Sequence, residues 1–81
     1  MPVVFSVDGI RFFFFSNEGD PREPIHIHVR KDTNLAKFWL QPAVQLADSY
    51  GFSSRELNKI GKIVEDRKLE IEVAWHEHFE S

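Results

Sequence analysis

Two short apolar stretches flank the pair Asp8-Gly9 near the start of the chain. Asp-Gly is typical of a two-residue type I′ hairpin turn, in which both residues need positive φ. The pattern therefore predicts a hairpin of two strands, residues 3–7 and 10–15. Its expected cross-strand pairs are Phe5 with Phe12, Val7 with Ile10, and Ser6 with Arg11. Phe13 and Phe15 interrupt the polar side, so the second strand is either covered on both faces or part of a subunit interface.

The segment from Pro24 to Arg30, with the sequence PIHIHVR, also alternates between apolar and polar residues. Successive side chains of a strand point to opposite faces, so the isoleucines and the valine share one face and the two imidazoles and the guanidinium share the other. We expect the apolar face to meet the core and the row His26, His28 and Arg30 to project outward. This row is the candidate functional site, because folding alone does not require it.

A further strand is expected at residues 36–40. An even number of residues in the loop before it would keep Ile27 and Val29 facing Leu40 and Phe38. Lys37 and Trp39 would then join the histidine row on one surface.

The chain beyond this strand contains a break and one more extended segment. Gln41-Pro42 ends the strand, a short extended piece is expected from Ala43 to Leu46, and a turn is expected near Tyr50-Gly51.

A helix is predicted after this turn. Ser53 and Glu56 match the S-x-x-E capping box of a helix start. The apolar residues that follow at helical spacing are Leu57, Ile60, Val64, Ile71 and Trp75. A straight helix from Ser53 to Phe79 would be about 39 Å long, against roughly 24 Å for twice the radius of gyration of such a globule. We therefore expect a bend or break at the charged run 65–68.

Residues 69–76 also alternate strictly, which is a strand pattern. No Gly, Pro or Asn separates them from the preceding helix, and this favours the helix. The predicted fold is thus α+β, a small, mostly antiparallel sheet of three to five strands packed against a long or broken C-terminal helix.

The composition agrees with one small packed domain, residues 1–81. The 81 residues include eight Phe and two Trp, which supply core area, and no Cys, which excludes disulfides and thiolate metal sites. Lys and Arg number 10 against 13 Asp and Glu, a net charge of −3 that argues against broad binding of nucleic-acid phosphates. The start lacks the basic region of an export signal and no apolar run has membrane-spanning length, so we expect a cytoplasmic location.

Two chemical interpretations compete with a plain structural role for the histidines. His26 and His28 on one strand face resemble part of a zinc site, with a third ligand to come from His76, Glu77 or His78. On a helix, the side chains of His76 and His78 point about 200° apart, so at most one of these two histidines could join the site. Alternatively, the imidazoles could serve as acid and base in RNA cleavage, with Arg30 and Lys37 stabilising a phosphate.

Several segments together resemble the bacterial domain-of-unknown-function 4160 family. They are FFSNE at 14–18, EPIHIHV at 23–29, AKFWL at 36–40 and the ending from Trp75 to Phe79. The resemblance implies a helical C-terminal part and marks His26 and His28 as a shared signature, without an established activity. Members are often encoded beside another short gene in what look like toxin-antitoxin modules, so the resemblance implies a protein partner.

We therefore expect a small interaction protein of a toxin-antitoxin-like pair. The residues expected to contact a protein partner or an anionic ligand are His26, His28, Arg30, Lys37 and Trp39. The alternative is an enzyme, either with a divalent metal on His26 and His28 or a metal-independent ribonuclease. No cofactor is expected otherwise, and a homo-oligomer is left open.

Overall fold

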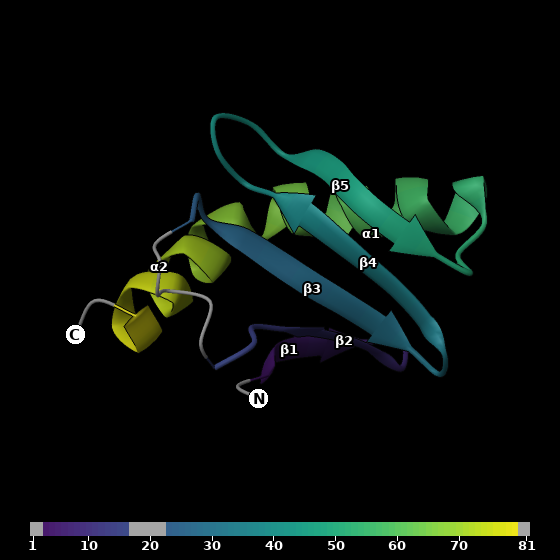
Figure 1. Cartoon of the computed structure of the whole chain (residues 1–81), viewed down its shortest axis with the longest axis horizontal. Helices are drawn as coiled ribbons and strands as arrows, with labels where there is room; N and C mark the ends of the chain where they lie inside the picture. Colours follow the sequence, from purple (N-terminus) through teal and green to yellow (C-terminus); the bar gives the residue numbers. More distant parts are fainter. Residues whose placement is uncertain (1–2, 17–22, 80–81) are drawn as a thin grey trace.

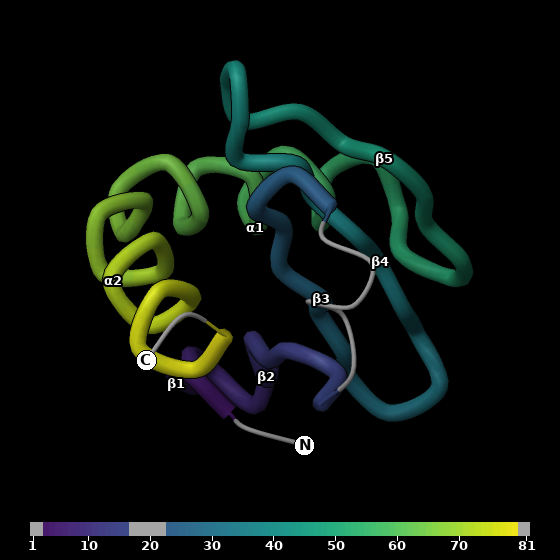
Figure 2. The backbone as a smooth tube through the Cα atoms, turned by 60° about the vertical axis from the view of Figure 1, so that its left-hand side comes forward, coloured from purple at the N-terminus to yellow at the C-terminus, as the bar shows by residue number. Residues whose placement is uncertain are grey.

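A computed structural model describes residues 3–16 and 23–79 of the chain. Its elements are β1 (Val3–Val7), β2 (Ile10–Phe13), β3 (His26–Lys31), β4 (Asn34–Trp39), β5 (Gln45–Tyr50), α1 (Ser54–Asp66) and α2 (Lys68–Phe79). The five strands form one antiparallel sheet in the order of the sequence. Both helices lie on the same side of this sheet (Figure 1), and the sheet curves around the core opposite them (Figure 2). The predicted α+β class is confirmed.

The first hairpin forms with the predicted turn and pairs, but its second strand ends at Phe13 and not at the predicted Phe15. Asp8 and Gly9 have φ of 51° and 77°, the positive values that a type I′ turn requires. The three expected cross-strand pairs, Phe5 with Phe12, Val7 with Ile10 and Ser6 with Arg11, are all present. The first of these pairs stacks, with 4.6 Å between ring centroids.

The hairpin of β3 and β4 has the predicted even loop. Lys31 pairs with Asn34 across the two residues Asp32 and Thr33. Ile27 pairs with Phe38 and Val29 with Ala36. On β4, these partners lie two residues before the expected ones, Leu40 and Phe38. Because side chains of a strand alternate with a period of two, a shift of two residues keeps every side chain on the predicted face.

The last strand differs from the expectation. The predicted extended piece from Ala43 to Leu46 starts too early and ends too soon, because β5 runs from Gln45 to Tyr50. All six of its residues are exposed, so no apolar alternation marked the strand in the sequence. It pairs with β4 as an edge strand, with an irregularity in register between Lys37 and Phe38.

The helical part follows the sequence signals closely. Ser53 Oγ accepts a hydrogen bond from the Glu56 amide at 3.1 Å, and the Glu56 carboxylate accepts one from the Ser53 amide at 2.8 Å, which completes the capping box. Helix α1 ends at Asp66, and Arg67, with φ −110° and ψ 21°, separates it from α2. The predicted break is thus confirmed, and the alternative of a strand over residues 69–76 is wrong.

The core lies between the sheet and the helices. Phe12, Ile27, Val29, Phe38 and Leu40 of the strands and the chain beside them meet Ile60, Val64, Ile71 and Trp75 of the helices, and all nine are buried. Neither helix of the described chain has the length and apolar character needed to cross a membrane.

Candidate binding face

The side of the sheet that faces away from the helices carries most of the residues predicted to be functional. We call this side the open face. Its side chains form rows across β2, β3, β4 and β5, because paired residues of neighbouring strands point the same way. One row is Phe13, His28, Lys37 and Asp48; the next is Arg11, Arg30, Leu35 and Tyr50.

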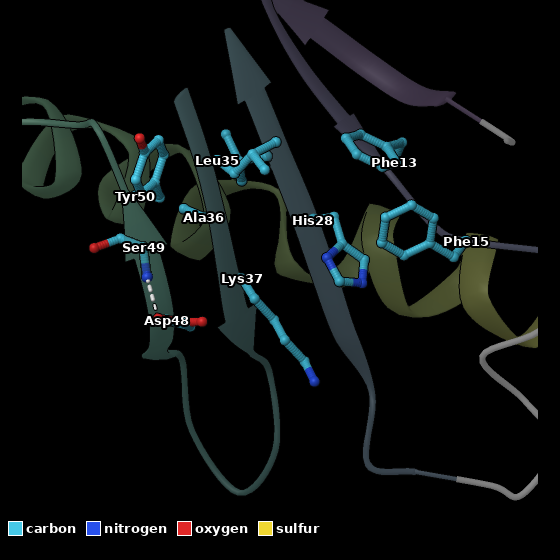
Figure 3. Close-up of a pocket in the computed structure, with 10 residues that line it drawn as sticks. Phe13, Phe15, His28, Leu35, Ala36, Lys37, Asp48, Ser49 and Tyr50 are labelled. Atoms are coloured by element: carbon cyan, nitrogen blue, oxygen red, sulfur yellow. Dashed lines mark hydrogen bonds between the residues drawn. The ribbon is translucent and has the colours of Figure 1, made fainter. Parts of the chain in front are cut away.

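A hollow of about 240 Å³ lies on the open face. Phe13, Phe15 and His28 lie at one side of it, and Leu35 and Tyr50 lie at the other (Figure 3). The Phe15 ring lies 4.4 Å from the His28 imidazole, and the Phe13 ring lies 5.7 Å from it, measured between centroids. His28 is therefore half-buried and held among aromatic rings at the edge of the hollow.

The second strand was expected either to be covered on both faces or to form part of a subunit interface, and Phe13 and Phe15 differ in this respect. Phe13 is buried on the open face, whereas Phe15 keeps 41% of its surface exposed. Phe12 and Phe14 point into the helix-covered core. The second strand is thus covered on both faces at Phe13, and an aromatic ring is left exposed just beyond it.

Lys37 is fixed in position by an aromatic ring and a carboxylate. Its Nζ lies 4.3 Å from the centroid of the Trp39 ring and 3.8 Å from a carboxylate oxygen of Glu23. A cation over an indole face is attracted by the negative potential of the ring. The structure therefore brings together Lys37, Trp39 and His28, as predicted.

His26 is not where the sequence analysis expected it. The prediction that its ring projects outward is wrong, since none of its surface is exposed. Its Nδ1 lies 2.9 Å from the Pro24 carbonyl oxygen, which can only accept, so Nδ1 carries the proton of this hydrogen bond. Its ring lies 5.4 Å from Trp39 and 5.0 Å from Trp75 of α2.

The cause of this burial is the length of β2. The ladder between β2 and β3 ends with the pair Phe13 and His28, so no β2 residue pairs with His26. At this end of the sheet, the side chain of Trp75 reaches the histidine ring. The first histidine of the motif is therefore enclosed between the sheet and α2, and only the second belongs to the open face.

The metal interpretation has no complete ligand set in residues 3–16 and 23–79, where no group of three or more His, Asp or Glu side chains is placed to hold an ion. The imidazoles of His26 and His28 lie 5.2 Å apart between centroids and nearly perpendicular. His78, one of the expected third ligands, lies against Phe14 instead, 6.4 Å between centroids.

Sequence reasoning missed four members of the open face, Arg11, Leu35, Asp48 and Tyr50. Arg11 could have been placed there from the hairpin register, which puts it opposite Ser6 on the polar side. Leu35 stands two residues before Lys37 and shares its face, but it lies outside the predicted strand 36–40. Asp48 and Tyr50 had no comparable signal, because β5 is exposed along its whole length. A second hollow, of about 570 Å³ between β5 and α1, contains none of the predicted site residues.

Fold and site together define a small α+β protein with one sheet face covered by helices and one open face of aromatic and cationic residues. A family model described as domain of unknown function (DUF4160) matches residues 9–76, and the chain belongs to this family. No curated protein and no solved structure matches the chain.

Proposed function

We propose that this protein is a small cytoplasmic interaction protein, one component of a toxin-antitoxin-like pair, that binds its protein partner through the open face. The observation that carries the proposal is the apolar surface left exposed there. Phe15, Leu35 and Tyr50 are 41%, 45% and 72% exposed around one hollow. Exposed apolar residues gathered at a hollow are typical of interaction sites, whereas scattered ones are not.

The charges of the open face indicate the character of the partner. Arg11, Arg30 and Lys37 lie on this face, Asp48 is the acid in their rows, and Glu23 forms an ion pair with Lys37. The chain as a whole has a net charge of −3, whereas the paired Arg11 and Arg30 give this face a local excess of positive charge among the described residues. Complementary charges steer association and fix its register, which favours a partner with an acidic surface.

The alternative of an enzyme receives less support. Acid-base cleavage of RNA by His26 and His28 would require both imidazoles to reach one substrate. His26 is buried and its Nδ1–H is bonded to the Pro24 carbonyl, so only His28 is placed to meet a ligand. A binding role for His28, Arg30, Lys37 and Trp39, with His26 supporting them from the core, agrees with these positions.

The proposal is tested by co-expression with the product of each flanking gene. We expect one of these products to co-purify with the protein, and the variant Leu35→Ser with Tyr50→Ser to weaken that complex by about tenfold or more, since buried apolar and aromatic anchors dominate interfaces. Leu69→Ser is the matched control, because Leu69 is 74% exposed on α2, away from the open face.

Three outcomes are informative. Loss of the complex in the open-face variant alone supports the proposal. Loss in Leu69→Ser alone would move the interface to α2. Absence of any complex with either flanking product would contradict the paired role.

A further inference from the structure

Arg11 and Arg30 lie directly opposite each other on β2 and β3, and both are exposed on the open face. No carboxylate within the described parts of the chain forms an ion pair with either guanidinium. Arg30 donates from Nε to the Asp32 carbonyl oxygen at 3.1 Å, which uses one of its five N–H donors. Among the residues that the structure describes, the pair therefore presents positive charge without an acidic partner.

Folding does not explain this pairing. Like charges directly opposite on neighbouring strands destabilise a sheet, and opposite charges are the stabilising choice at such positions. The row that contains the two arginines continues to Ser6 on one side and to Leu35 and Tyr50 on the other, without an acidic side chain. A cost to stability at an exposed position with no internal compensation is typical of a binding site.

We propose that Arg11 and Arg30 form a clamp for a carboxylate of an acidic segment of the protein partner. This clamp rests on the function proposed above, and it specifies that the partner segment bound by the open face is acidic. Two guanidiniums on paired residues can approach one carboxylate from both sides, each with two parallel N–H donors that match its oxygens. Their mutual repulsion is relieved when the anion binds.

The hollow beside the clamp indicates which residues flank the acidic residue of the partner segment. Leu35 lies directly beside Arg30 in the same row, and Tyr50 lies beside Leu35, so the clamp adjoins the apolar lining. A volume of about 240 Å³ admits one or two apolar side chains. The segment that fits therefore places an aliphatic or aromatic residue next to its Asp or Glu.

A peptide fits this surface better than a nucleic acid. A phosphate backbone requires a continuous track of cations, and the row beside the clamp ends in Asp48. The net charge of −3 acts against a polyanion at longer range. An acidic segment with alternating apolar residues needs only the local charge of the clamp.

The main experiment compares Arg11→Gln, Arg30→Gln and the double variant in the complex with the co-purifying flanking product. We expect each single change to weaken binding by about tenfold and the double change to remove most of its salt dependence. Arg55→Gln is the control, because Arg55 is an exposed arginine on α1. If the double variant binds as tightly as the wild type while Leu35→Ser with Tyr50→Ser does not, the clamp is refuted and the interaction role stands.

A second arm does not require the natural partner. The Nε–H signals of the arginines are followed by NMR during titration with a synthetic peptide of alternating Leu and Glu, with the same peptide carrying Gln for Glu, and with single-stranded oligouridylate. We expect the Glu peptide to shift the signals of Arg11 and Arg30, and the Gln peptide to leave them in place. Equal shifts by both peptides, no shift by the Glu peptide, or stronger shifts by the RNA would each overturn the inference.

Thermal melting separates binding from a structural role. If the arginines supported the fold, Gln at either position would lower the melting temperature. The clamp predicts the same or a higher melting temperature for each single variant, because the repulsion between the two guanidiniums is removed.

Discussion

The imidazole of His26 and the indole of Trp75 lie 5.0 Å apart between ring centroids, at an angle of 61°. This contact joins the first residue of β3 to the second helix across the end of the sheet. Both residues are buried, and Trp75 also packs against Phe14 and Phe79. The two histidines of the motif therefore lie in different environments, His26 buried against α2 and His28 on the open face.

His26→Ala is expected to destabilise the fold. The change removes a buried ring and leaves the Pro24 carbonyl without its donor, so we expect a loss of about 2–4 kcal/mol in the free energy of unfolding. His26→Asn, whose amide can replace the Nδ1–H donor, should lose less. Urea unfolding followed by circular dichroism measures both. His28→Ala, as the matched control, should lose less than about 1 kcal/mol, and equal losses at the two histidines would contradict this division of roles.

The capping box makes the stability of α1 depend on pH. Hydrogen bonds from the Ser53 backbone and side chain lower the pKa of Glu56, with a smaller contribution from the charge of Lys31. A carboxyl whose pKa is lower in the folded state stabilises the fold above its unfolded-state pKa, and this contribution is lost as the pH falls through the folded-state pKa.

We therefore expect Glu56→Gln to be less stable than the wild type at neutral pH, with a difference that shrinks as the solution is acidified. Melting temperatures of both proteins from neutral pH to about pH 3 test this. Ser53→Ala removes the cap itself and should cost about 1 kcal/mol at neutral pH. A difference between Glu56→Gln and the wild type that grows on acidification would be inconsistent with the lowered pKa.

Two glycines with positive φ should respond differently to alanine. At Gly9, with φ 77°, an added Cβ meets no atom within 4 Å, so Gly9→Ala is expected to cost only the backbone strain, about 1 kcal/mol. At Gly51, with φ 89°, the same Cβ would collide with the Asn34 side chain, so a cost of about 2–3 kcal/mol is expected. Chemical denaturation of Gly51→Ala with and without Asn34→Ala measures the steric part, which the second change should recover.

Arg67 connects the helix break to the first strand. Its guanidinium lies 4.4 Å from the centroid of the Phe5 ring and 3.7 Å from a carboxylate oxygen of Glu70. Arg67→Ala is expected to lose about 1 kcal/mol of stability, and Arg67→Lys about half of that, because the cation is retained without the planar group. Arg55→Ala, on an exposed part of α1, should change stability by less than about 0.5 kcal/mol in the same denaturation experiment.

The sequence predicted those parts of the fold that depend on local chemistry. Asp8-Gly9 determines its turn through positive φ, and Ser53 with Glu56 begins the helix through mutual hydrogen bonds. The alternation in β3 and β4 determined which side chains share a face. By contrast, β5 is exposed along its whole length and therefore has no apolar pattern from which its bounds could be predicted.

The candidate site was predicted only in part, because some of its contacts join residues that are far apart in the sequence. The burial of His26 depends on where β2 ends and on the position of Trp75, 49 residues later in the sequence. The juxtaposition of Arg11 and Arg30 depends on the register between β2 and β3, which the long connection between these strands does not determine. Period-two alternation gives the face of a residue but not its neighbours on a distant strand.

From Ile27 onwards, the alternation of β3 and β4 places the residues that pack the core and the more exposed residues on opposite sides of the sheet. His28, Arg30, Leu35 and Lys37 can be exchanged without touching the core, because their immediate neighbours in sequence carry the packing on the opposite side. The surface proposed to bind the partner can thus change one alternate position at a time, while the residues that pack the core stay the same.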